Sequence, residues 1–200
     1  MLGSGVKPFT REVYEDEVFT LDHRSQDVQE VSFYNCEFRG CQFNEVSLKR
    51  SRFVSCLFSD CDLSMVDVTD AVFRDTRFER TALVGVNWSL IDTSDLQGVG
   101  LDFDACTLNY ATFLGLDLSK GQMTDCSARE VYLAEVNFSE ADLSGTDFVG
   151  STLVKCDLTH ADLRGAKNYA INVMNNKVTG VKVSLGEALG LLAGLEIAFE

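Results

Sequence analysis

The chain of 200 residues carries 17 basic and 31 acidic side chains, which give a net charge of -14 at pH 7, and 46% of its residues are hydrophobic. Its length is that of one domain with a core. No stretch approaches the roughly 18 consecutive apolar residues of a membrane-spanning helix. The composition therefore excludes an integral membrane helix, and the acidic balance argues against direct binding to nucleic acid phosphates.

Residues 1–30 show only traces of the period that governs the rest of the chain, at Val13, Val18 and Val28. The charged segments YEDE and DHRSQD predict an irregular, partly strand-like cap, which would cover the apolar end of a stack of repeats. The first residues contain no charged and then apolar leader of the kind that directs secretion. We therefore expect a cytoplasmic protein.

Residues 31–168 follow a strict five-residue period. Of the 27 central positions, spaced five apart from Phe33, only Thr93, Gly98 and Ala128 lack a large apolar side chain, and 11 of the 14 phenylalanines occupy such positions. Neither the 3.6-residue period of a helix nor the two-residue period of a flat strand explains this spacing. The pattern predicts one short structural unit repeated along the chain.

Each block of five is interpreted as a short extended piece followed by a turn. Residues two apart share a face of extended backbone, so the first and third residues of each block are expected to point inward. The second position is Asp or Asn in 11 of 27 blocks, and these side chains suit turns because they accept hydrogen bonds from nearby backbone amides. Small first residues fit an interior position beside the large third ones; they include Val31, Cys36, Cys41, Val46, Ala71, Ala141 and Ala161.

The segment WSLIDTSDLQGVGL, residues 88–101, interrupts the pattern. Thr93 and Gly98 replace large central residues, yet the period resumes at Phe103 without a shift. Two interpretations stay open. The segment is either a locally degenerate coil, or a kink or bulge that divides the stack into two parts.

Residues 169–200 are expected to form a final coil and a tail. Ser184 and Glu187 have the spacing of a capping box, and the leucines that follow suit one face of a short helix. Three glycines weaken that helix by roughly 1 kcal/mol each relative to alanine. Ile197 and Phe199 alternate with other residues as in a short edge strand.

No constellation of catalytic or metal-binding residues stands out. All seven cysteines occupy the first position of a block, which predicts small core residues kept reduced in the cytoplasm. Their spacing lacks the close pairs of a zinc site, and His23 and His160 have no marked catalytic partner. Carboxylates four blocks apart, such as Asp142 and Asp162, are an unavoidable result of repetition. We expect neither an enzyme nor a bound metal or other cofactor.

Acidic side chains concentrate in residues 81–165, where 13 acidic residues are present against 4 basic ones. At outward positions along a narrow rod, they would attract a basic partner surface, including one that normally holds DNA. Solubility alone is the alternative explanation. The candidate partner-binding residues of this predicted acidic face are Asp117, Asp125, Glu130, Glu135, Glu140, Asp142, Asp147, Asp157 and Asp162.

The block order of a small residue, Asp or Asn, Leu or Phe and two variable positions resembles the pentapeptide-repeat family across residues 31–168. The resemblance implies an all-β fold, a right-handed quadrilateral parallel β-helix with four blocks in each coil. A short C-terminal helix is expected to follow it.

Within this family, the chain resembles the branch that protects DNA gyrase from topoisomerase poisons such as quinolones and albicidin. The GVNW turn at residues 85–88 and the tail look most like the albicidin-resistance member. The resemblance implies a non-catalytic homodimer that binds gyrase in competition with DNA by mimicking duplex shape and charge. In that branch the tail joins two copies, which assigns the dimer interface to Leu189, Leu192, Leu195, Ile197 and Phe199.

Two features depart from that branch. No long loop is evident between coils, of the kind that several quinolone-resistance members use to contact the enzyme, and the tail is rich in glycine. The alternative function is therefore a generic pentapeptide-repeat scaffold or protein-binding module with another partner.

Overall fold

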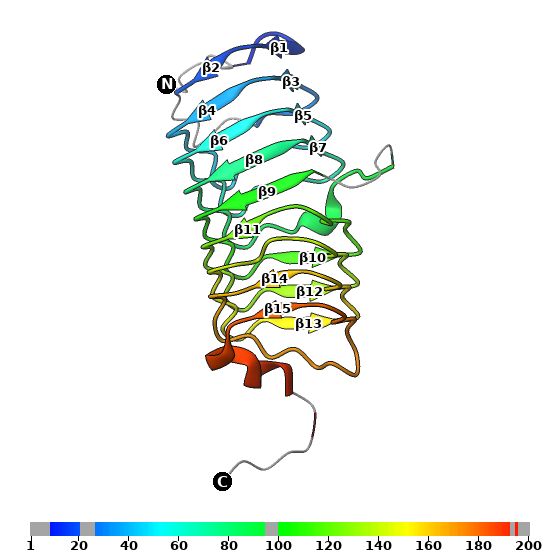
Figure 1. Ribbon diagram of the computed structural model, residues 1–200. Coiled ribbons are helices and arrows are strands. Elements are labelled where there is room, and N and C mark those ends of the chain that lie inside the picture. Colours follow the sequence, from blue (N-terminus) through cyan, green and yellow to red (C-terminus); the bar gives the residue numbers. More distant parts are fainter. Residues whose placement is uncertain (1–8, 21–26, 95–99, 193–194, 196–200) are drawn as a thin grey trace.

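The structure of the protein is a computed structural model that describes residues 9–20, 27–94, 100–192 and 195. The chain winds into a parallel β-solenoid of about eight turns, with the first and last coils at opposite ends of the stack (Figure 1). This confirms the all-β parallel β-helix predicted from the repeat. The right hand of the helix stays a prediction.

The strands of the described residues form four sheets. The first contains β1 (Val13–Glu15), β3 (Ser32–Tyr34), β5 (Arg52–Val54) and β7 (Val72–Arg74). The second contains β2 (Val18–Phe19), β4 (Glu37–Arg39), β6 (Leu57–Ser59), β8 (Thr76–Glu79), β9 (Leu101–Asp104) and β11 (Met123–Thr124). The third contains β10 (Thr112–Leu114), β12 (Tyr132–Ala134) and β13 (Thr152–Val154), and the last pairs β14 (Asp162–Leu163) with β15 (Lys182–Val183).

One block of five residues makes one side of a coil. Ser32 pairs with Arg52, four blocks further on, and Thr112 pairs with Tyr132 in the same way. The stack therefore has four faces, named here by their central residues. Face A has Phe33, Phe53, Phe73, Leu118, Phe138 and Leu158, and face B has Phe38, Phe58, Phe78, Phe103, Met123 and Leu143. Face C has Phe43, Leu63, Leu83, Leu108, Ala128 and Phe148, and face D has Leu48, Val68, Trp88, Phe113, Leu133 and Leu153.

Central side chains of one face stack on each other inside the solenoid. On face B the ring centroids of Phe38 and Phe58 are 4.5 Å apart, and those of Phe58 and Phe78 are 5.0 Å apart. First-position residues fill the space beside them, as the sequence predicts. The seven cysteines are all buried, namely Cys36, Cys41, Cys56, Cys61, Cys106, Cys126 and Cys156.

Polar first residues are also buried, and each of several forms hydrogen bonds between coils. Thr146 donates its hydroxyl to the carbonyl of Met123 at 2.7 Å and accepts the amide of Cys126 at 3.1 Å. Equivalent pairs of bonds are formed by Ser51, Thr81, Ser151 and Asn176. Each of these side chains links two successive coils and satisfies a buried backbone amide of the preceding coil.

The fifth residue of most described blocks turns the corner with a positive φ. Asp125, Glu130 and Glu140 have φ values of 51°, 52° and 60°. The second-position carboxylate supports the turn, because Asp62 accepts the amide of Ser64 at 2.9 Å. The sequence indicated the role of the second position, whereas the glycines at fifth positions, such as Gly85, Gly145 and Gly165, were a sign of the left-handed conformation that sequence reasoning missed.

The first coil departs from the period traced in the sequence. Val13 pairs with Ser32, so this coil is shorter by one residue than the coil that pairs Ser32 with Arg52. Tyr14 and Phe19 therefore point inward, while Val13 and Val18 are exposed. The prediction was wrong for these two valines, although Val28 is buried as expected.

The irregular segment contains one additional block. Phe58 pairs with Phe78, four blocks further on, whereas Phe78 pairs with Phe103, five blocks further on. The 3₁₀ helix η1 (Trp88–Leu90) forms the end of the face D side of this coil. The backbone amide of Asp92 then donates to the carbonyl of Ala71, and the chain rejoins the stack at Gly100, whose carbonyl accepts the amide of Thr76. The stack continues from β8 to β9 (Figure 1). Because the insertion has the length of one block, it does not shift the period, and the sequence alone did not identify it as an insertion.

The C-terminal end carries a second 3₁₀ helix, η2 (Leu185–Leu192). The predicted capping box is not formed, because the Ser184 hydroxyl accepts the amide of Gly165 at 2.9 Å, while Glu187 donates its amide to the Ser184 carbonyl. Leu191 packs against the core. Among the described residues, no helix has the length and apolar character that crossing a membrane requires.

Candidate partner-binding surfaces

The nine carboxylates predicted to form an acidic face do not share one face. Successive blocks occupy successive sides of the coil, so residues five apart in sequence point in different directions. Asp117 and Asp157 lie on face A, Asp142 and Asp162 on face B, Asp147 on face C, and Asp125, Glu130, Glu135 and Glu140 at the four corners. Their role in binding a partner stays a prediction.

Second-position aspartates are engaged by their own turns. Asp117, Asp142 and Asp157 each accept, at 3.0 Å, the amide of the residue two positions later. Asp147 and Asp162 form the same contact at 3.2 Å and 3.1 Å. These carboxylates have a structural role, so their presence is not by itself a sign of a binding site.

Several of the nine charges are also neutralised by neighbouring cations. Lys177 lies 2.8 Å from Asp157, and together with the Thr159 hydroxyl it lowers the pKa of Asp157 to about 2. Asp162 pairs with Arg164 at 2.6 Å, and Glu135 pairs with Lys155 at 2.9 Å. Asp147 pairs with Arg129 at 2.8 Å. These four acidic residues contribute little net field.

A compact group of carboxylates nevertheless lies on face B and at the two corners beside it. We call it the central acidic patch: Asp102, Asp104, Asp125, Glu140 and Asp142. Asp102 and Asp104 flank Phe103 in β9, and Asp102 and Asp142 lie above and below Gln122. Across the described parts of the chain, Asp104 is the one member with an ion pair, to Arg77 at 3.6 Å.

Asp102 and Asp104 were missing from the residues proposed from sequence. Both flank a central residue, and this position marks them as outward-facing. Their place beside Asp142 depends on the longer coil, which moves every later block by one side. The position of Asp102 and Asp104 relative to Asp142 could be derived only once the location of the additional block was known.

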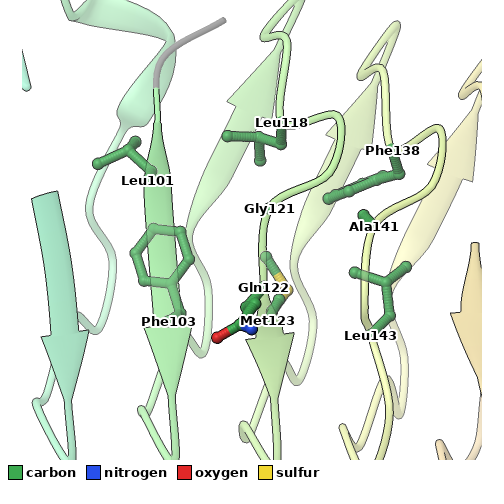
Figure 2. Close-up of a pocket in the computed structure, with 9 residues that line it drawn as sticks. All are labelled: Leu101, Phe103, Leu118, Gly121, Gln122, Met123, Phe138, Ala141 and Leu143. Atoms are coloured by element: carbon green, nitrogen blue, oxygen red, sulfur yellow. The ribbon is translucent and has the colours of Figure 1, made fainter. Parts of the chain in front are cut away.

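The wall beneath the central acidic patch is apolar and tightly packed (Figure 2). Leu101, Phe103, Leu118 and Met123 surround Gly121, and the space among them does not admit a water-sized molecule. A Cβ atom on Gly121 would lie 3.2 Å from the Leu118 carbonyl oxygen. The space beneath the central acidic patch is therefore too small to hold a small ligand.

The cysteine thiols are buried in the core, whereas His160 is exposed. Burial raises the pKa of the Cys56 thiol to about 12, which disfavours the reactive thiolate. His160 occupies an exposed corner above Gly180, and His23 lies outside the described residues. Within those residues, no group of three or more His, Cys, Asp or Glu side chains has the arrangement of a metal site.

Comparison with protein families accounts for the repeat. Residues 27–113 match a family model described as a pentapeptide repeat region, and residues 131–167 match one described as pentapeptide repeats in 8 copies. The chain belongs to the pentapeptide-repeat family. A search of curated proteins finds no match to this chain.

Solved structures of QnrB1, a plasmid-mediated fluoroquinolone resistance protein, have the same fold. The full-length protein is 21% identical with a TM-score of 0.63, and the match covers 92% of this chain and 100% of that chain. A trypsin-treated form is 22% identical with a TM-score of 0.62, covering 94% of this chain and 97% of that chain. At this level of identity the likeness concerns the fold.

Proposed function

We propose that this pentapeptide-repeat protein is a non-catalytic, cytoplasmic partner of DNA gyrase that protects the topoisomerase from a poison. The observation that carries the proposal is the similarity to QnrB1 along nearly the whole length of both chains. The central acidic patch supports a binding mode in which the rod occupies a basic surface that otherwise holds DNA. Albicidin and quinolones are the proposed classes of poison.

A gyrase supercoiling assay in the presence of a poison tests this function. We expect added protein to raise the poison concentration that halves supercoiling. The double variant Asp125→Lys/Glu140→Lys should weaken protection, because it reverses two charges of the central acidic patch. Both residues occupy corner positions whose equivalents elsewhere are Arg80 and Lys120, so the backbone accepts the change.

The matched control is Glu45→Lys/Asp70→Lys, which makes the same change in net charge at corners outside the patch. Equal loss of protection by both double variants would assign the effect to overall charge. Inhibition that is unchanged over a wide range of added wild-type protein would contradict the proposed function.

The alternative is a scaffold or binding module with another partner. The distribution of the predicted carboxylates over several faces and corners, with four in ion pairs, favours this alternative. A wild-type protein that binds a basic protein other than gyrase, and leaves poisoning unchanged, would support it.

We also propose that the tail forms a homodimer. Leu185 and Leu189 in η2 are exposed, while Leu192 and Leu195 are partly buried. Ile197 and Phe199 lie outside the described residues. The apolar side chains exposed at this end fit burial against a second copy.

Removal of residues 184–200 should convert the dimer to a monomer in light scattering. Leu189→Asp should weaken the dimer with less effect on the solenoid, since Leu191 holds η2 against the core. The exposed Met174→Asp, near the same end of the molecule, serves as the control. Dimers that persist after the truncation would refute the tail as the interface.

A further inference from the structure

Exposed apolar side chains gather on face D, away from the central acidic patch. Leu90, Tyr110, Leu114 and Tyr132 have exposed fractions of 43%, 59%, 47% and 46%. Tyr110 occupies the corner between faces C and D, and Leu90 is the last residue of η1, which lies directly above β10. We call these four residues the apolar strip.

The outward positions between these residues carry no charge. Thr112, Tyr132 and Thr152 form one column across β10, β12 and β13, while Leu114, Ala134 and Val154 form the next. The three parallel strands lie one above another along the stack (Figure 1). The outward positions of β10, β12 and β13 therefore form an uncharged sheet surface, which is bordered at the corner between faces D and A by the ion pair of Glu135 and Lys155.

The same coils are mostly polar on their other faces, where Val149 on face C is an exposed apolar exception. The outward positions equivalent to Thr112 and Leu114 are Asp117 and Ser119 on face A, and Ser127 and Arg129 on face C. Folding does not require apolar residues at outward positions, because the core is filled by Phe113, Leu133 and their neighbours. Their concentration on one face indicates a surface that is covered in a complex.

The charge at the edge of the strip selects the kind of partner. Glu130 follows Tyr110 at the corner between faces C and D, and it has no ion pair within the described residues. A second copy would bring an identical glutamate and another net charge of -14 to the contact. A partner surface that is apolar at its centre and edged by lysine or arginine would complement both the apolar strip and Glu130.

We infer that face D, through the apolar strip, is a second docking surface for such a basic-edged protein partner, opposite the central acidic patch. The inference rests on the proposed function, and purified DNA gyrase is the probe. The affinity of the full-length chain for gyrase is measured by a direct binding titration. Leu114→Arg and Leu114→Glu should each weaken binding by roughly tenfold or more, because both remove an apolar contact at the centre of the surface.

Ser139→Arg is the matched control, since it makes the same charge change as Leu114→Arg on face A of the same part of the rod. Thermal unfolding of each variant verifies that the outward substitutions leave the solenoid folded. If Leu114→Glu bound gyrase as tightly as the wild type, the apolar contact at Leu114 would be refuted. If Leu114→Arg and Ser139→Arg weakened binding equally, the effect would be assigned to charge.

Two further outcomes separate the levels of the proposal. If the wild-type chain does not bind gyrase, the proposed function fails and the inference fails with it. If the wild type binds gyrase and the Leu114 variants bind equally well, the inference about face D alone is overturned. A dimer that is lost on Leu114→Arg substitution would assign the strip to a second copy, which also overturns the inference.

Discussion

Phe58→Ala is expected to lower the free energy of unfolding by about 3–5 kcal/mol, the range found for deleting a buried aromatic ring. Phe58 is fully buried, and its ring stacks between Phe38 and Phe78 while meeting Phe53 edge to face at 5.5 Å. The cavity would interrupt the stack between three coils. Urea unfolding followed by circular dichroism measures the change.

Leu57→Ala is the matched control, because Leu57 is the preceding residue of β6 and points outward on face B. Its expected cost is below about 1 kcal/mol, since little apolar surface is removed from the core. A cost for Leu57→Ala as large as that for Phe58→Ala would contradict the alternation of inward and outward residues.

Asn176→Leu is expected to destabilise the last coils by about 2–4 kcal/mol, because a buried polar group that loses its partner costs roughly 1–3 kcal/mol. Asn176 accepts the amide of Cys156 at 2.8 Å and donates to the carbonyls of Leu153 and Asn172 at 3.1 Å and 2.9 Å. Leucine replaces the volume and none of these hydrogen bonds. Hydrogen exchange at the Cys156 amide, together with urea unfolding, checks the result.

Two variants test whether hydrogen bonding is the cause. Asn176→Ser should cost less than Asn176→Leu, because Ser51 and Ser151 make the equivalent pair of bonds in other coils. Asn175→Leu, at the neighbouring exposed position, should change stability by no more than about 0.5 kcal/mol. Equal stability of the serine and leucine variants at position 176 would refute the role of the hydrogen bonds.

Most of the fold was predictable because the period is visible in nearly every block. The large third residue and the small first residue are both inward, and the buried cysteines follow from the same rule. The first coil was harder to predict, because its shorter register moves Tyr14 and Phe19 into the core in place of Val13 and Val18. In this coil a single residue decides which side chains face inward.

The candidate surfaces were less predictable than the core. Sequence reasoning identified Asp125, Glu140 and Asp142 as outward carboxylates, and it missed Asp102 and Asp104, which complete the central acidic patch. It also missed the apolar strip, because Tyr110 and Tyr132 are separated in sequence by residues that lie on three other faces. Surface groups form across coils, whereas a linear pattern shows only which residues face outward.

By itself, the sequence determined the repeating unit, the inward residues and the acidic character of the second half. These properties depend on local spacing, since extended backbone places residues two apart on the same side. The tertiary structure decided which blocks lie above one another, because the additional block between Asp92 and Gly100 has the length of the period and does not shift its phase. That vertical register brings Asp102 beside Asp142 and Leu114 beside Tyr132, and it thereby defines both candidate surfaces.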